Sequence, residues 1–133
     1  MIARHIVTFV ILGAIAMTAV GCVRLQPLHT PSFQVATTDS SKIQEAIRQA
    51  LLDRHWSIIA RRSDGFDAEY RRTPQMGAKI RVTHAGDKVA IQYLDSSEME
   101  YSTQEGFPEI HKRYNVWVAN LERDIQVEVG RRL

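Results

Sequence analysis

Three residues in the second half of the chain have the side chains of a hydrolase triad. Asp95, Ser96 and His111 supply a carboxylate, a hydroxyl and an imidazole. In such a triad the imidazole takes the serine proton and the carboxylate orients the imidazole. The surrounding sequence gives little support: no Gly-x-Ser-x-Gly turn or glycine-rich oxyanion segment is present, and Asp95-Ser96-Ser97 is ordinary turn chemistry. A hydrolase is therefore the alternative, not the leading prediction.

Polar residues on the last predicted helix form a second candidate group. His111 and Asn115, like Asn120 and Asp124, are four residues apart, so the members of each pair share one helix face. We expect these pairs to hydrogen-bond neighbouring loop backbone and to lock the helix to a loop. The candidate partner- or ligand-binding residues are Asp95, Ser96, Tyr101, His111, Asn115 and Asn120.

Aromatic residues could line a ligand groove, but their spacing favours the core. Aromatic side chains at strand and helix periodicity more often pack against other elements than against a ligand. We therefore expect them inside the fold. The residues concerned are Trp56, Tyr70, Tyr93, Tyr101, Tyr114 and Trp117.

A metal centre is not predicted. Short metal-binding motifs place histidines at spacings such as His-x-x-x-His. The histidines beyond the leader are far apart, and the only cysteine stands at the end of the leader. We predict no metal and no cofactor. The histidines are His29, His55, His84 and His111.

The single cysteine, Cys22, lies between an apolar leader and the part of the chain that is predicted to fold. Arg4 and His5 give a short basic start, and an apolar run from Ile6 to Val20 follows. A processed secretory signal needs an apolar region of about 7–15 residues and a small-residue cleavage site, whereas a membrane span needs about 20. Residues 1–21 are therefore predicted to be a signal peptide. Without a lipid on Cys22, this leader would either be cut by the ordinary signal peptidase or be kept as a membrane anchor.

The cleavage region, Ala19-Val20-Gly21-Cys22, resembles the lipobox of bacterial lipoproteins. The resemblance implies that the signal is cut just before Cys22 and that this cysteine carries the lipid. Two or three acyl chains would anchor the protein stably, since each buried CH₂ contributes about 0.8 kcal/mol. Val23 in place of Asp after the cysteine implies the outer membrane, with the protein facing the periplasm.

The mature chain is one nearly neutral domain. Removing 21 of 133 residues leaves 133 − 21 = 112, and removing Arg4 leaves 16 basic against 15 acidic residues. This balance gives no case for nucleic acid as a partner. Residues 54–81 are rich in basic side chains and residues 95–109 in acidic ones. The polar faces of strands and a solvated loop would explain this split, and a dipolar docking surface would also explain it.

Residues 22–39 contain Pro27 and Pro31 without helical periodicity, which predicts a tether that holds the domain clear of the membrane. The alternation of Phe33 and Val35 with polar neighbours could instead add a short edge strand. A helix follows from Ser40 or Ser41, because Ser41 and Gln44 have the spacing of a capping box and an apolar stripe begins there.

Four strand-like runs with alternating apolar residues and tight turns come next, at residues 56–61, 66–71, 78–83 and 89–94. An acidic connection and a second amphipathic helix, from about Pro108 to Val129, complete the chain. The predicted fold of the single domain, residues 40–133, is α+β. It is a two-layer sandwich with the order αββββα, in which two helices cover one face of a four-stranded antiparallel meander.

The folded part resembles a family of small, uncharacterised bacterial lipoproteins over roughly residues 42–125. The resemblance rests on Trp56 after a helix, on Tyr-x-Asp-Ser at 93–96 with Met99 and Tyr101, and on Ile-His-x-x-Tyr-Asn-x-Trp-Val-x-Asn-Leu at 110–121. It implies the fold and the envelope location. It implies no activity and no catalytic residues.

The leading prediction is a lipid-anchored periplasmic domain without catalysis. It would bind or brace an envelope component, either a membrane protein, a sister lipoprotein or cell-wall glycan. The alternatives are a small hydrolase that uses Ser96, His111 and Asp95, and a carrier of a small ligand or lipid. The oligomeric state is left open by the sequence.

Overall fold

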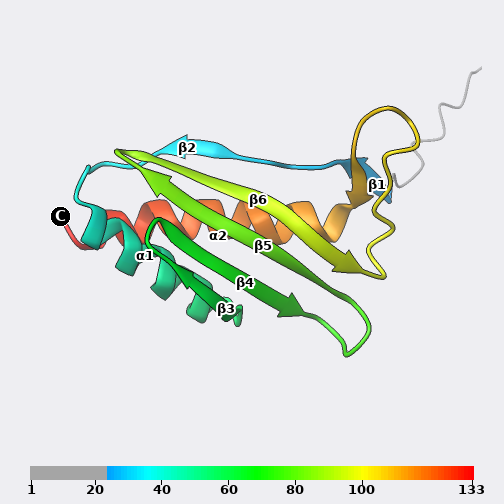
Figure 1. The fold of residues 1–133 in the computed structure, drawn as a ribbon, viewed down its shortest axis with the longest axis horizontal. Coiled ribbons are helices and arrows are strands. Elements are labelled where there is room, and N and C mark those ends of the chain that lie inside the picture. The colour runs from blue at the N-terminus through cyan, green and yellow to red at the C-terminus, as the bar shows by residue number, and fades with distance from the viewer. Residues whose placement is uncertain (1–23) are drawn as a thin grey trace, which may run out of the picture.

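The computed structural model describes residues 24–133, drawn in colour in Figure 1. Cys22 and the predicted signal peptide, residues 1–21, lie outside the described residues and stay predictions. In chain order the elements are β1 Leu25–Pro27, β2 Ser32–Gln34, α1 Ser40–Asp53, β3 Ser57–Arg62, β4 Gly65–Arg71, β5 Gly77–Ala85, β6 Lys88–Ser97, β7 Glu109–His111 and α2 Lys112–Arg131.

The architecture is α+β, with a sheet in one layer and two helices in the other. Strands β3 to β6 form the predicted antiparallel meander, and β2 adds a fifth strand to give the order β2-β6-β5-β4-β3. Helices α1 and α2 lie side by side behind this sheet in the view of Figure 1. A separate two-stranded sheet pairs β1 with β7. The predicted class and helix placement are confirmed, while the strand count differs.

The predicted tether is wrong for most of its length. Strand β2 pairs antiparallel with β6, with Phe33 opposite Val89, and the side chains of Phe33 and Val35 are buried. The edge-strand alternative is therefore confirmed. Two effects favour it over a free tether: β6 would otherwise present unpaired backbone groups at the sheet edge, and burying apolar side chains is favourable.

Helix α1 begins as expected but is capped differently. The Asp39 carboxylate accepts hydrogen bonds from the backbone N–H groups of Ser41 and Lys42, at 3.1 and 3.2 Å. The bond from Lys42 is the main reason why the pKa of Asp39 is lowered. The predicted capping box of Ser41 and Gln44 is wrong, because a carboxylate at the N-cap already satisfies these amides and suits the positive end of the helix dipole.

Gln44 joins α1 to the sheet instead. Its side-chain Nε2 donates to the backbone carbonyl oxygens of Arg62 and Gly65, at 3.2 and 3.3 Å. Its Oε1 lies 2.7 Å from Nε2 of His84, which is buried at the end of β5. Since the Gln44 amide nitrogen is the donor, its oxygen must accept, so the His84 ring donates from Nε2. Burial lowers the pKa of His84, which favours the neutral ring.

Helix α2 starts four residues later than predicted, at Lys112 rather than Pro108. Residues 109–111 form β7, in which Glu109 pairs with Pro27 of β1. The backbone N–H of His111 donates to the carbonyl oxygen of Met99 at 2.8 Å. The extended conformation of residues 109–111 is therefore set by partners that are distant in the sequence.

The core fills the space between the helices and the sheet. All five residues of the predicted α1 stripe are buried, namely Ile43, Ala46, Ile47, Ala50 and Leu51. On α2 the stripe is confirmed at Tyr114, Val118, Leu121 and Ile125, whereas Trp117 is only half-buried. In β3 a bulge between Ile58 and Ala60 breaks the predicted alternation. Ala60 is consequently exposed, and the guanidinium of Arg61 lies over the ring of Phe66.

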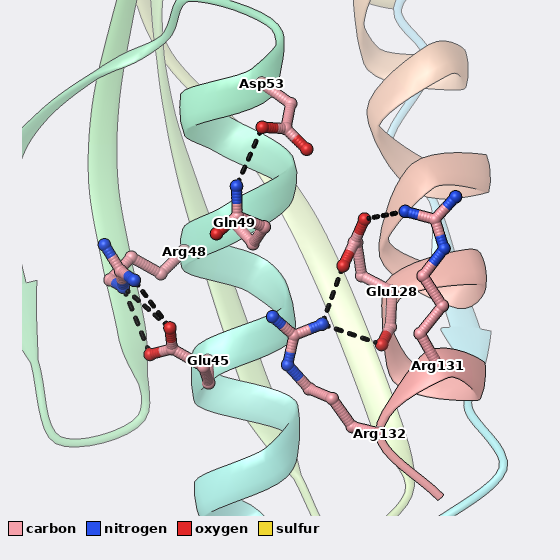
Figure 2. Close-up of polar contacts among 7 residues, drawn as sticks. All are labelled: Glu45, Arg48, Gln49, Asp53, Glu128, Arg131 and Arg132. Carbon is pink, nitrogen blue, oxygen red and sulfur yellow. Dashed lines mark hydrogen bonds and ion pairs between the residues drawn. The ribbon is translucent and has the colours of Figure 1, made fainter.

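Figure 2 shows a set of polar contacts that stay within one helix or its C-terminal end. Glu128, 7% exposed, accepts from Arg131 at 2.8 Å and from Arg132 at 2.6 Å. On α1, Arg48 bonds to Glu45 through paired contacts. The buried Glu128 carboxylate is therefore neutralised by arginines at its own helix end.

Substitutions at Tyr114 can test how the core is packed around its hydroxyl group. The Oη of Tyr114 is buried without a hydrogen-bond partner among the described residues, and this burial raises its pKa. We expect Tyr114→Phe to raise the free energy of unfolding by about 1 kcal/mol, because it removes an unsatisfied polar group. Tyr114→Ala, which leaves a cavity, should lower it by about 3–5 kcal/mol. Urea unfolding measures both, and a loss of stability in Tyr114→Phe would contradict the unsatisfied hydroxyl.

His84 should make the fold sensitive to acid. Its folded-state pKa is lowered by burial, so below its ordinary value of about 6.5 the unfolded chain binds more protons than the folded one. The free energy of unfolding should therefore fall as the pH decreases from 7.5 to 5.0. His84→Gln should reduce this decrease, while the exposed His55→Gln should keep it. Equal slopes in the wild type and in His84→Gln would show that another group carries the pH dependence.

Candidate functional site

The candidate functional site is an open cleft of about 400 Å³ where the end of α1 meets β4 and α2. Aromatic residues form one wall, and polar residues from the end of α1 and from α2 form the rim. This cleft is called the aromatic cleft below. Its lining residues are Asp53, Arg54, His55, Trp56, Tyr70, Trp117 and Asn120.

Three aromatic rings build the wall: one from the connection between α1 and β3, one from β4 and one from α2. The ring centroids of Trp56 and Tyr70 lie 5.5 Å apart at an interplanar angle of 44°, and those of Tyr70 and Trp117 lie 4.8 Å apart at 74°. Trp56 is 3% exposed and supports the wall from the core, while Tyr70 and Trp117 are half-buried. Tilted and edge-to-face pairs are favourable ring geometries, so the wall is fixed before any ligand arrives.

His55 reaches the cleft from a backbone conformation that usually belongs to glycine. Helix α1 ends with Trp56 N–H donating to the Leu51 carbonyl oxygen at 2.9 Å and His55 N–H donating to that of Leu52 at 3.0 Å. These two bonds define a Schellman motif, whose turn residue takes a left-handed conformation and is usually glycine. His55 has φ = 63°. A side chain at this position costs about 1 kcal/mol relative to an unstrained backbone.

The charged groups at the rim are already paired within the protein. Arg54 donates from Nε to Asp124 at 2.6 Å, which links the end of α1 to α2 across the rim. The Asp53 carboxylate accepts from the side chain of Gln49 at 2.8 Å. In the part of the chain that the structure describes, the rim therefore has no lysine or arginine without a carboxylate partner.

Several neutral hydrogen-bonding groups of the lining have no protein partner among residues 24–133. Asn120 uses its Oδ1 to accept from Arg123 at 3.0 Å, and its Nδ2 makes no bond to these residues. The other groups are the ring of His55, the indole N–H groups of Trp56 and Trp117, and the hydroxyl of Tyr70. The cleft therefore combines aromatic surface with neutral groups that can hydrogen-bond to a ligand.

A second hollow adjoins the aromatic cleft. It measures about 200 Å³ and shares Asp53 with the cleft. Its other lining residues come from α2 and are Asp124, Val127, Glu128 and Arg131. The concave surface thus continues from the aromatic wall along the two helices.

Of the six candidates from the sequence, only Asn120 lines the aromatic cleft. Ser96 has its Oγ 2.7 Å from the hydroxyl of Tyr93, and Tyr101 stacks on the Tyr93 ring at 4.3 Å. His111 caps α2, accepting at Nδ1 from the backbone N–H of Arg113 at 3.1 Å. Asp95 accepts from the backbone N–H of Ser96 at 2.8 Å. No hydrogen bond between described residues joins His111 to Ser96 or Asp95.

Asn115 ties α2 to the N-terminal segment. Its Oδ1 accepts from the backbone N–H of His29 at 2.9 Å, and its Nδ2 donates to the carbonyl oxygen of Pro27 at 2.9 Å. The imidazole of His29 lies 3.1 Å from Glu122 on the same helix. The predicted lock between helix and loop backbone is confirmed for Asn115 and is wrong for the other three residues of the two pairs: His111 caps its own helix, and Asn120 and Asp124 bond to arginine side chains. The loop concerned belongs to the segment expected to be a tether.

Four of the seven basic residues in the stretch 54–81 pair with carboxylates. The carboxylate of Asp67 accepts two bonds from Arg81, at 2.8 and 3.0 Å, and these bonds lower the pKa of Asp67. In the acidic stretch, Glu100 pairs with Arg24. The paired arginines of the basic stretch are Arg54 with Asp124, Arg62 with Asp64, Arg71 with Glu69, and Arg81 with Asp67.

The spacing of the aromatic residues in the sequence favoured a place in the core over a place in a ligand groove. The structure divides them: Tyr114 is in the core, Tyr93 and Tyr101 stack near the start of β7, and the other three wall the cleft. His55 was missed as a site residue. A signal was present, because α1 ends without the glycine or asparagine that usually follows a helix.

Comparisons of the chain with protein-family models, with curated proteins and with solved structures found no match in any of the three. Among residues 24–133, no three His, Cys, Asp or Glu side chains gather closely enough to hold a metal ion. Neither helix in this range is long and apolar enough to span a bilayer.

The role of Asn115 can be tested by hydrogen exchange. We expect Asn115→Ala to speed amide exchange at His29 and its neighbours, and to lower the free energy of unfolding by about 1–2 kcal/mol because buried partners lose their bonds. Asn120→Ala is the matched control, since its one contact is to Arg123 within α2. Unchanged exchange at residues 25–29 in Asn115→Ala would refute the locking role.

Proposed function

We propose that the protein is a lipid-anchored, non-catalytic binding or bracing domain of the bacterial envelope, and that the aromatic cleft is its binding surface. The single observation that carries the proposal is this cleft, whose wall is built from packed rings and whose neutral polar groups have no hydrogen-bond partner among residues 24–133. Largely preformed concave sites with aromatic lining and a few polar groups are typical of ligand-binding sites.

The short link between the lipid and the fold supports a role close to the membrane. If Cys22 carries the lipid, only Val23 and Arg24 separate it from β1, which begins at Leu25. An extended chain spans about 3.3–3.6 Å per residue, so the anchor would allow roughly 10 Å of reach. The domain would therefore stay at the outer-membrane surface, facing the periplasm. The components within its reach are membrane proteins, sister lipoproteins and cell-wall glycan.

The composition of the cleft supports binding rather than catalysis. Its lining contains no serine, threonine, cysteine or lysine, and its one histidine, His55, makes no hydrogen bond among the described residues that would let it activate Asp53 or Tyr70 as a nucleophile. A glycosidase needs two carboxyl groups with separate roles. Here Asp53 is the one carboxylate of the lining, and the nearby Asp124 is bonded to Arg54.

The alternatives have less support. A hydrolase would need Ser96, His111 and Asp95 to interact, whereas the Ser96 hydroxyl bonds to Tyr93 and the His111 Nδ1 caps α2. A carrier would need an enclosed apolar cavity, whereas the aromatic cleft is open and has a polar rim of Asp53, Arg54 and Asn120. No contact or cavity of the described residues favours the hydrolase or the carrier.

Site-specific photocrosslinking in intact bacterial cells tests the proposal. A photoreactive residue at Asn120 should give a discrete crosslinked envelope component, while the same residue at Arg72, in the exposed β4–β5 turn, should give none. Labelled fatty acid should be incorporated into the wild type and lost in Cys22→Ser, together with the Asn120 crosslink. Trp117→Ala should also remove the crosslink, and Val116→Ala, at an exposed neighbouring position, should keep it.

Two outcomes would contradict the proposal. The absence of fatty-acid labelling would remove the anchor. A labelled and folded protein that crosslinks equally from residues 120 and 72, or from neither, would remove the cleft as the binding surface.

A further inference from the structure

We infer that the aromatic cleft binds an uncharged pyranose ring of an N-acetylated cell-wall glycan, and that His55 is a ligand-contacting residue. This inference rests on the proposed function for the envelope location and for the use of the cleft. It adds the chemical class of the ligand, and it adds His55, whose backbone is strained, as a residue that contacts the ligand.

The wall of the cleft suits the apolar face of a sugar ring. The C–H groups on one face of a pyranose carry a small positive charge, and they pack favourably against the negative face of an aromatic ring. Tyr70 and Trp117 are half-buried and held at fixed angles, with Trp56 behind them. One ring can lie in the 400 Å³ cleft, and the adjoining 200 Å³ hollow leaves space for a neighbouring ring of a chain.

The charge of the rim disfavours an anionic ligand. A phosphate or carboxylate would need an unpaired cation, but Arg54 is committed to Asp124. The Asp53 carboxylate accepts from the neutral side chain of Gln49 and forms no ion pair among the described residues, so it also disfavours an anion, and the titration below includes a quaternary ammonium ion to test for a cation. The unpartnered groups are mainly neutral donors: the Asn120 amide and the two indole N–H groups. These donors match sugar hydroxyl groups and an acetamido carbonyl.

The backbone at His55 points to a role for its side chain. Glycine would adopt φ = 63° without strain. The His55 ring makes no hydrogen bond to the described residues and is exposed, so it offers the fold no visible compensation. It nevertheless lines the cleft. A ligand contact explains why a histidine occupies a position that suits glycine.

The protein supplies its own probe for the test. It has two tryptophans, and both line the cleft, so tryptophan-selective fluorescence reports on this site. The full-length protein, purified in detergent, is titrated with oligomers of N-acetylglucosamine. We expect a saturable fluorescence change, and about fivefold to tenfold weaker binding in Asn120→Ala, as for the loss of one hydrogen bond.

His55→Gly should separate stability from binding. Relief of the left-handed strain should raise Tm by roughly 4–8 °C, while affinity for the oligomer falls about fivefold or more. Glu98→Gly is the matched control because Glu98 also has a positive φ, of 53°, but lies outside the cleft. It should raise Tm similarly and leave the affinity unchanged.

Each contrary result is distinct. No fluorescence response from a folded protein, or a response to tetramethylammonium or inorganic phosphate but not to the oligomer, would overturn the glycan inference. Crosslinking from residue 120 to a membrane protein would meanwhile leave the proposed function in place. Unchanged oligomer affinity in His55→Gly would overturn the role of His55.

Discussion

The structure depends on covering one apolar face of a twisted antiparallel sheet. Strands β4 to β6 present Phe66, Ile80, Val82 and Ile91 to a single side, where all four are buried. Helices α1 and α2 are the only helices of the described residues, and they lie together on this face. Because two amphipathic helices and a one-sided sheet can bury their apolar surfaces only against one another, the layer arrangement follows from this constraint.

The N-terminal segment pairs with the strand that would otherwise be an open edge of the sheet. Strand β2 covers β6, and β1 pairs with β7. Asn115 then bonds to backbone between the two strands, so α2 holds the segment in place. A segment used in this way cannot also serve as a long spacer. If Cys22 carries lipid, the fold itself sets how near the membrane the domain lies.

The aromatic cleft arises where the cover of the sheet ends. Helix α1 stops at Asp53, and the Schellman turn through His55 brings Trp56 into the core beside Tyr70. Helix α2 continues past this point and contributes Trp117. The concavity follows from unequal coverage of the sheet by two helices of different length. Arg54 and Asp124 close the rim with an ion pair, which leaves neutral groups for a ligand.

Local patterns in the sequence determined the α+β class, the four meander strands, the two helices and most of the core, because the periodicity of apolar residues is set by backbone geometry. They also predict a signal peptide that ends before Cys22, and this stays a prediction because the described residues do not reach it. Tertiary structure alone decided the strands at Leu25–Pro27, Ser32–Gln34 and Glu109–His111, because each of these three-residue strands is stabilised by partners far along the chain. It also decided the site: Trp56, Tyr70 and Trp117 have unremarkable spacing in sequence, and only the packing of three elements brings their rings together.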